Sequence, residues 1–353
     1  MDQTETLAPQ VVYRGRGSLF GLLLRNLGLN IVTLGFYRFW GRTRLRRYLW
    51  SNIEVLGDPL AYTGTGMELF KGFLIALCVL APYFIAVNLL TTLVAGNMLA
   101  VRLVSFSTSI VFLFLYQFAV YRARRYRLSR TMWRGIRCGQ DGSAAGYAVQ
   151  VICWMALIGL TLGVYYPWMR MNQQARLLRH TVVGDQRVEF DGRGRDLLGP
   201  WLIVMATLGL AYIWCRVREF RYVMAHTQVG EVRFDSALPF WPVFRRFVLA
   251  PILVLAGWFL FIFVVGFIVE MWMFVIGVNP RGFSKYYGFI GFISFFVLFS
   301  LLIWPLIYVP ILRQICATLH IENPNGLSAI VQSTQAVPAT GEGIADAFDV
   351  GLG

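Results

Sequence analysis

The sequence predicts an α-helical polytopic membrane protein built from divergent internal repeats. Its 353 residues are 57% hydrophobic and only 14% charged, which is far from the composition of soluble domains. Long apolar runs alternate with short arginine-rich stretches. One motif also occurs several times along the chain, which is the sequence signature of a protein built from repeats. Each repeat is expected to contain an apolar hairpin, an amphipathic helix rich in arginine and aromatic residues, and a short cytoplasmic β-hairpin.

Apolar runs of two lengths occur. Four are long enough to cross ~30 Å of hydrocarbon at about 1.5 Å per residue; they are residues 69–95, 99–121, 247–278 and 288–311. Three shorter ones are residues 18–36, 145–166 and 197–214. Basic residues flank each short run on both sides, which conflicts with a simple crossing under the positive-inside rule. We therefore interpret the short runs as re-entrant or interfacial segments and expect four full crossings, with both termini in the cytoplasm. Seven crossings are the alternative.

A motif of threonine, leucine and glycine with a later tryptophan interrupts each short run. The copies are Thr33-Leu34-Gly35 with Trp40, Thr161-Leu162-Gly163 with Trp168, and Thr207-Leu208-Gly209 with Trp214. A basic helix start follows the first and third copies, at Arg44–Tyr48 and Arg218–Tyr222, and a further basic stretch is Arg122–Tyr126. After the second copy, the corresponding stretch is Asn172–Arg176, which has lost most of the basic residues.

A glycine phrase, aromatic-x-Gly-x-Gly, precedes the apolar runs. It occurs as Tyr13–Gly17, Tyr62–Gly66 and Phe190–Gly194. Its spacing fails the dinucleotide fingerprint, so a strand-to-helix bend is favoured over nucleotide binding. Glu68 and Asp196 then fall in the first turn of the next helix, where a carboxylate meets the positive end of the dipole. Short β-prone runs with a glycine turn predict β-hairpins at residues 53–58, 182–185 and 228–231. We expect these hairpins to pair into one small sheet, because a single hairpin is too weak alone.

Several of these motifs together resemble a known family. They are T-L-G-F-Y-R-F-W and R-L-R-R-Y-L-W in residues 33–50, Y-T-G-T-G-M-E-L-F in residues 62–70, and G-E-G-I-A-D-A-F-D in residues 341–349. The chain resembles the YjgN-like family of bacterial inner-membrane proteins of unknown function. The resemblance implies a multi-pass protein of the inner membrane and carries over no catalytic residue. The degraded stretch Asn172–Arg176 departs from the arginine pattern.

Catalytic or metal chemistry has little support in the sequence. The three histidines, His180, His226 and His320, are too far apart for H-E-x-x-H, and the five cysteines show no C-x-x-C spacing. His180 and His226 are expected to form hydrogen bonds at helix ends. We expect no enzyme activity, no metal and no cofactor.

The basic helices offer the best candidate for function. On a helical wheel starting at Tyr37, one face carries the residues of an R-x-x-R-Y pattern, and the opposite face, with Arg38, Arg42 and Arg46, is expected to face water. Such a face could clamp anionic lipid headgroups. The candidates are Arg44, Arg47, Tyr48, Arg122, Arg125, Tyr126, Arg218, Arg221 and Tyr222. Alternatively, these arginines only anchor the helices or pair with Glu54, Glu68 and Asp185.

Polar residues within apolar runs form a second set of candidates. They are Asn26, Asn30, Asn88 and Glu270. The asparagines could line a polar path or form hydrogen bonds between helices, which is the commoner role. Glu270 is the lone acid in a span, and such residues suggest function, although the long span favours a position at the far interface.

Residues 1–322 are expected to form a single membrane domain, and residues 323–353 a flexible tail with an acidic, apolar end that could dock onto a basic surface. The favoured function is the binding or moving of anionic lipid, or of another amphiphile, at the cytoplasmic leaflet. A non-catalytic scaffold that docks a partner protein and a small-solute transporter are the alternatives. Nucleic acid is not an expected partner, because membrane orientation already explains the basic charge.

Overall fold

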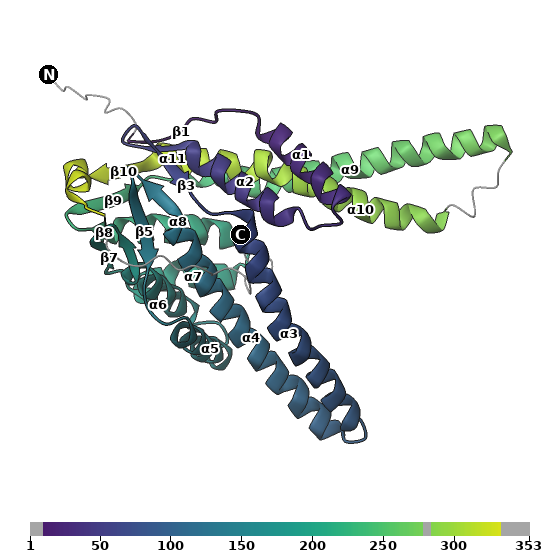
Figure 1. Ribbon diagram of the computed structural model, residues 1–353, viewed down its shortest axis with the longest axis horizontal. Coiled ribbons are helices and arrows are strands. Elements are labelled where there is room, and N and C mark those ends of the chain that lie inside the picture. The colour runs from purple at the N-terminus through teal and green to yellow at the C-terminus, as the bar shows by residue number, and fades with distance from the viewer. Residues whose placement is uncertain (1–9, 278–283, 333–353) are drawn as a thin grey trace.

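The computed structural model describes residues 10–277 and 284–332. The strands gather at one end of the molecule, and the helix pairs α3–α4 and α9–α10 extend from it as two long arms (Figure 1). The helices and strands, in chain order, are β1 (Val11–Tyr13), α1 (Leu19–Val32), α2 (Arg38–Ser51), β2 (Ile53–Val55), β3 (Asp58–Tyr62), α3 (Gly66–Leu93), α4 (Met98–Ser129), β4 (Thr131–Trp133), β5 (Ile136–Gln140), α5 (Ala144–Leu160), α6 (Tyr166–Arg179), β6 (Thr181–Val183), β7 (Gln186–Phe190), the 3₁₀ helix η1 (Gly194–Leu197), α7 (Leu198–Ala206), α8 (Tyr212–Ala225), β8 (Thr227–Val229), β9 (Val232–Ser236), α9 (Phe240–Ile276), α10 (Ser284–Ile303), the π-helix η3 (Trp304–Tyr308), α11 (Val309–Thr318), β10 (Leu319–Glu322) and the 3₁₀ helix η4 (Pro324–Ala329).

Four helical stretches are long and apolar enough to cross a membrane. Within the described residues they are Gly66–Leu93, Met98–Ser129, Phe240–Met273 and Gly291–Thr318. At most 11% of the most apolar window of each is buried inside the protein, so these apolar surfaces require another apolar environment. This architecture is that of a polytopic membrane protein, and the four long apolar helices were predicted from the sequence.

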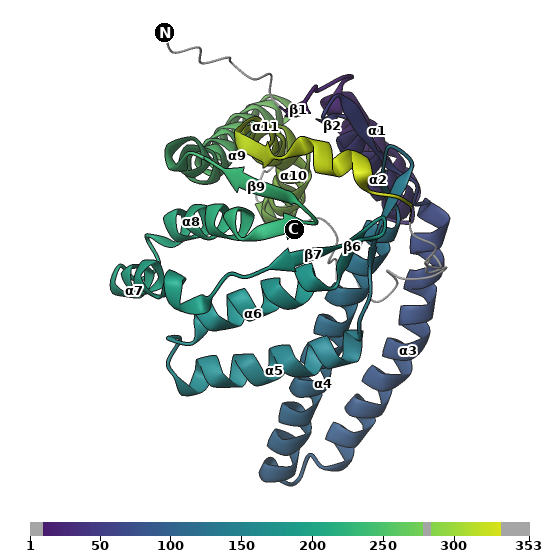
Figure 2. The same cartoon turned by 90° about the vertical axis from the view of Figure 1, so that its left-hand side faces the viewer.

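The three short apolar runs form helix pairs of their own: α1–α2, α5–α6 and α7–α8. The first helix of each pair has 14, 17 and 9 residues, respectively. Figure 2 shows α5, α6 and α8 in successive layers beside the long pair α3–α4. Each pair enters from the strand end of the molecule and returns to it.

The strands form one antiparallel sheet in which each strand pairs with its neighbours in sequence, from β1 to β10. The prediction that the hairpins pair into one sheet is therefore confirmed. The sheet curls around a shared core that includes Val11 of β1, Trp133 of β4, Val188 of β7 and Ile321 of β10. Its two ends approach each other, since the amide N–H of Ile321 donates to the Gln10 side-chain oxygen.

The folded part of the chain continues beyond residue 322. Leu327 and Ile330 are only 8% and 6% exposed and belong to the sheet core. Asp185 and Val331 exchange two hydrogen bonds of 2.9 and 3.0 Å, which fasten this segment to the β6–β7 turn. The prediction of a flexible tail from residue 323 was therefore wrong for its first ten residues, because their apolar side chains complete the core. The acidic, apolar end at residues 341–349 lies outside the described residues.

Candidate functional site

The Thr-Leu-Gly motif is the turn that joins the two helices of each short pair. Thr33 caps the end of α1: its hydroxyl donates to the Leu29 carbonyl at 2.8 Å and accepts from the Tyr37 amide at 2.9 Å. Thr161 and Thr207 make the same two contacts in the other pairs. The glycine follows with a φ of about +91° or +92° in all three turns, and its amide reaches back to a helix carbonyl, which ends the helix.

The leucine of each turn has an unfavourable backbone conformation and a solvent-exposed side chain. Leu34, Leu162 and Leu208 have φ values of 52°, 49° and 50°, in the left-handed region that costs a non-glycine residue about 1–2 kcal/mol. Their side chains are 90%, 85% and 95% exposed. Asparagine or glycine would suit such a turn better in water. The three helix pairs thus end in apolar tips.

The glycine phrase allows close packing between successive helix pairs. A Cβ on Gly66 would lie 2.9 Å from the Cα of Trp40, and one on Gly194 would lie 2.6 Å from the Cα of Trp168. The second glycine of the phrase therefore lets the start of one helix pair touch the second helix of the pair before it. This contact supports the interpretation of the phrase as a strand-to-helix bend.

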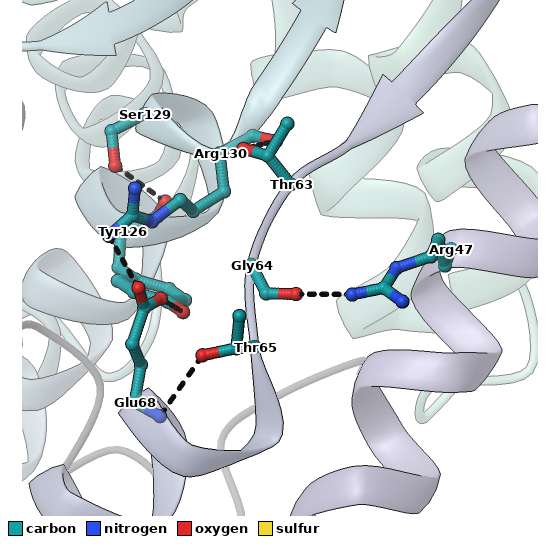
Figure 3. Close-up of polar contacts among 8 residues, drawn as sticks. All are labelled: Arg47, Thr63, Gly64, Thr65, Glu68, Tyr126, Ser129 and Arg130. Carbon is teal, nitrogen blue, oxygen red and sulfur yellow. Dashed lines mark hydrogen bonds and ion pairs between the residues drawn. The ribbon is translucent and has the colours of Figure 1, made fainter.

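Figure 3 shows how the R-x-x-R-Y residues of α2 and α4 meet the start of α3. The Tyr126 hydroxyl donates to the Glu68 carboxylate, and the Arg130 guanidinium pairs with the same carboxylate at 2.9 Å. The Arg47 guanidinium donates to the Gly64 carbonyl at 3.0 Å. Glu68 lies in the first turn of α3, as predicted.

The same contacts recur around α8. The Tyr222 hydroxyl donates to the Asp196 carboxylate at 2.5 Å and accepts from the Arg193 amide at 2.8 Å, and burial raises the pKa of Tyr222. Arg221 donates to the Leu238 carbonyl at 2.7 Å. In α2, the Tyr48 hydroxyl donates to the Gly17 carbonyl at 3.1 Å. The tyrosine of all three copies, and the second arginine of the copies in α2 and α8, thus form contacts within the protein.

The first arginine of the pattern has a different environment. The guanidinium carbon of Arg44 lies 5.3 Å from the centre of the Tyr37 ring, and that of Arg218 lies 5.5 Å from the Trp214 ring. Both side chains are exposed, and within the described residues neither has a hydrogen bond or an ion pair. Arg122 lies 6.0 Å from the Phe118 ring. Arg125 is half-buried, and its Nε has no hydrogen-bond partner among the residues that the structure describes.

The opposite face of α2 does not face water as the wheel predicted. Arg46 is fully buried, at 0% exposure, and its guanidinium donates to the Tyr62 hydroxyl at 3.1 Å. Arg38 lies about 5 Å from the rings of Phe39 and Phe73. The prediction for Arg46 was wrong because α2 packs against both β3 and α3, so it has more than one protein-facing side.

The polar residues of the apolar runs do not come together. The Asn26 amide donates to the Gly41 carbonyl at 3.2 Å, which joins α1 to α2 as expected for an interhelical contact. The side-chain oxygen of Asn30 is buried and has no partner within the described residues. Asn88 is exposed on α3. Glu270 is exposed near the end of α9, thirty residues or about 45 Å from its start, which suits a position at the far interface.

Two polar clusters were missed by sequence reasoning. The Glu219 carboxylate, only 4% exposed, pairs with Arg170 at 3.0 Å and with Arg216 at 2.5 Å, and so ties α6 to α8. The Asp141 carboxylate contacts His180 Nδ1 at 2.7 Å and Arg187 at 2.8 Å. Arg216 lies three residues before Glu219 on α8, a spacing that the sequence does show. Arg170, His180 and Arg187 come from other helices or strands than the carboxylates they contact, so no sequence spacing could have indicated those pairs.

The histidines do lie at helix ends. His180 and His226 cap α6 and α8, and Nδ1 of His226 contacts the Tyr222 carbonyl at 2.9 Å. Among the residues that the structure describes, no group of three or more His, Cys, Asp or Glu side chains could hold a metal ion.

The family model for bacterial protein of unknown function (DUF898) matches residues 8–206, more than half of the chain. The chain belongs to this family. Its resemblance to YjgN-like proteins is confirmed by matches to two inner membrane proteins of that name. It is 29% identical to inner membrane protein YjgN of Escherichia coli K12 over 137 residues, which are 38% of this chain and 32% of that protein. It is 32% identical to the Salmonella typhimurium protein of the same name over 81 residues, 23% of this chain and 20% of that protein. The matched region thus spans a third or less of these relatives. No solved structure matches this DUF898 chain.

Proposed function

We propose that this protein binds anionic lipid at the cytoplasmic leaflet of the bacterial inner membrane, through the exposed guanidinium groups of Arg44 and Arg218. The inner membrane comes from the names of the relatives. One observation carries the lipid proposal. Each of these two guanidiniums, unpaired within the described residues, lies over an aromatic ring, ten residues after an exposed leucine at a helix-pair tip.

The proposed topology has four full crossings and three short helix pairs that enter only one leaflet. All ten strands belong to one sheet, so the sheet lies on one side of the membrane and every helix pair starts and ends on that side. Each helix pair can then either cross the membrane twice or not cross it at all. The first helices α1 and α7 have 14 and 9 residues, or about 21 and 14 Å, which is too short for ~30 Å of hydrocarbon. Both chain ends then lie with the sheet, on the cytoplasmic side.

We interpret the helix pairs with their strands as divergent repeats. The three Thr-Leu-Gly turns share the same φ values and the same threonine contacts, and Arg47 and Arg221 reach carbonyls at the same distance along the chain. Such equivalence is expected when one unit has been copied. The lipid-binding arginines then occupy the same position in two copies.

The turn leucines support insertion into the leaflet. An exposed leucine in the left-handed region costs free energy twice in water, once for the backbone and once for the side chain. Hydrocarbon around Leu34, Leu162 and Leu208 removes the second cost. Interfacial helices bury their apolar side about 5–10 Å deep. Arg44 and Arg218 lie near the end of the second turn of α2 and α8, about 9 Å beyond the first residue of each helix, which brings them to headgroup depth.

Headgroup phosphates suit these guanidiniums. Arginine binds phosphate bidentately, and a ring beneath the planar group keeps one side free for a ligand. Each arginine near an anionic surface contributes about 1 kcal/mol, or roughly fivefold in affinity. Neither the non-catalytic scaffold nor the transporter alternative gains a specific contact of this kind.

The proposal is tested by counting lipids bound to the purified full chain. Arg44→Ala with Arg218→Ala is expected to lower phosphatidylglycerol binding at least fivefold in native mass spectrometry, to the level of phosphatidylcholine. The matched control is Arg137→Ala with Arg233→Ala, which removes the same charge from exposed strand positions. Equal losses in both variants would contradict a specific site.

The topology has a separate test. In a cysteine-free chain, a cysteine at Glu231 in the β8–β9 turn and one at Gly96 between α3 and α4 are expected to react with a membrane-impermeant thiol reagent from opposite sides. Both positions are exposed, and a side chain at Gly96 meets no atom within 4 Å. Labelling of both from the same side would refute two crossings by α3–α4.

A further inference from the structure

A cavity of about 550 Å³ lies where α2, α4, η3 and α11 meet beside β2. These elements belong to the first, second and last helix pairs, so the cavity exists only because the sheet closes the chain into one body. Cavities that bind small molecules in proteins have volumes of about 300–1,000 Å³. Arg44 and Arg218 do not line it, so this is a site separate from the proposed lipid-binding arginines.

The cavity wall is mostly apolar. Aliphatic side chains from three elements line it, among them Leu49, Leu128 and Leu312. Aromatic rings also line it: Trp50 on α2, and Trp304 and Tyr308 on the π-helix, whose ring centres lie 4.8 Å apart. A wall of this kind accommodates a hydrocarbon chain.

One side of the cavity carries positive charge. Arg124 and Arg127 both line it and are one helical turn apart on α4. The Arg124 guanidinium donates to the Thr181 hydroxyl at 3.2 Å, but its buried Nε has no hydrogen-bond partner within the described residues. In that same part of the chain, no carboxylate lies within ion-pair distance of Arg124. A largely buried cation without a counter-ion is costly, so an anion is the expected occupant.

The backbone at the cavity is unusual. Trp304–Tyr308 is a π-helix, and Pro305 and Pro310 lie in and just after it. A π-turn inside a helix is less stable than an α-turn and occurs frequently at functional sites. Here it sets the positions of the two aromatic rings that face the cavity.

The cavity also lies at a suitable depth. Arg124, Arg127 and Leu128 belong to the last turns of α4, beyond the apolar part of this membrane-length helix and next to β4. An amphiphile from the leaflet would reach this level with its head group. The positive wall and the apolar wall then meet the two ends of such a molecule.

We propose that the cavity binds one single-chain amphiphile with an anionic head group, a carboxylate or a phosphate monoester. The head group pairs with Arg124 and Arg127, and the hydrocarbon chain lies along Leu49, Trp304 and Leu312. The volume fits one chain, which separates this ligand from the two-chain lipids of the bilayer.

The test is a titration of the full-length protein in neutral lipid nanodiscs with 9,10-dibromostearate, whose bromines quench nearby tryptophans. A saturable quench is expected, and Trp304→Phe should remove much of it. Arg124→Gln is expected to weaken binding about tenfold or more, whereas Arg233→Gln, an exposed strand arginine, should leave it unchanged. Equal affinities in the two variants, or quenching without saturation, would overturn the proposal.

Leu312→Trp provides a second variant in case Arg124→Gln fails to fold, because it fills the cavity and keeps the charge. It should abolish the saturable quench.

Competition by a single-chain phosphate monoester and by palmitate distinguishes the head groups, and displacement by neutral lysophosphatidylcholine at equal concentration would overturn the role of charge. Asp346→Asn with Asp349→Asn should change nothing; tighter ligand binding in that variant would mean that the acidic chain end is the occupant. Arg44→Ala with Arg218→Ala should bind dibromostearate normally, so the two sites fail or succeed separately.

Discussion

Gly194→Ala tests whether the glycine phrase exists to join successive helix pairs. An ideal Cβ at Gly194 would lie 2.6 Å from the Cα of Trp168 and 2.9 Å from its backbone nitrogen. Unstrained carbon atoms meet at about 3.5–4.0 Å, so α6 and η1 must separate by roughly 1 Å. Backbone atoms of a helix cannot turn aside as a side chain can. The φ of Gly194 is not in the left-handed region, so the cost comes from the contact alone.

The expected cost is moderate and has a definite sign. Overpacking of this kind destabilises by about 1–3 kcal/mol, and the helix preference of alanine offsets at most about 1 kcal/mol. Gly199→Ala in α7 is the matched control, since no heavy atom lies within 4 Å of its added Cβ. That change should leave the stability unchanged or raise it by up to about 1 kcal/mol.

The measurement is the thermal unfolding midpoint in neutral detergent, followed by intrinsic fluorescence. Gly194→Ala should lower the midpoint by roughly 2–6 °C, and Gly199→Ala should not lower it. Gly66→Ala should behave as Gly194→Ala does, because its Cβ would lie 2.9 Å from the Cα of Trp40. Equal midpoints for Gly194→Ala and Gly199→Ala would refute the packing role.

Three further changes test other parts of the structure. Glu219→Gln leaves Arg170 and Arg216 without their buried anion and should lower the free energy of unfolding by about 3 kcal/mol, as measured by thermal unfolding. Glu231→Gln on the exposed β8–β9 turn should leave it almost unchanged. The Val331 amide donates to Asp185 and holds the pKa of this carboxyl below its usual value. The contribution of Asp185 to docking of the last described segment is therefore fully present above about pH 4 and is lost as the pH falls further, and Asp185→Asn should speed amide exchange of Val331 at neutral pH. Leu208→Asn should preserve stability in detergent and reduce it in a bilayer; loss in both would contradict leaflet insertion.

The sequence was sufficient to predict the long helices, the turns and the sheet. Their signals are local: an apolar run of sufficient length, a threonine cap with a glycine, and a β-prone run on each side of a glycine. The hairpin β4–β5 was missed, although its turn Arg134-Gly135 has the same backbone conformation as Leu56-Gly57 in the predicted hairpin β2–β3. The spacing from Arg122 to Arg134 equals that from Arg44 to Leu56, and this match could have revealed it.

The candidate site could be predicted only in part. The recurrence of R-x-x-R-Y marked equivalent positions on three helices, but it could not indicate which of these residues have partners within the protein. Arg47 binds a carbonyl and Tyr126 a carboxylate that follow β3 in the chain, and only the closed sheet brings these groups to the helix. Arg44 is exposed on α2 and, within the described residues, has no hydrogen bond or ion pair. Pairing between distant segments is not encoded in a local pattern.

The cavity adds an asymmetry that the surface arginines lack. Leu49 and Arg127 each lie four residues before the strand that follows their helix, and both line the cavity. Seven residues before those strands lie Arg46 and Arg124, and within the described residues the Nε of each has no hydrogen-bond partner. Arg46 is fully buried and does not line the cavity, whereas Arg124 does. Equivalent positions of α2 and α4 thus present an apolar wall on one side and a charged wall on the other. An apolar ligand would leave the charge uncompensated, and a small anion would leave the apolar wall in contact with water. Only a molecule with both parts satisfies both walls.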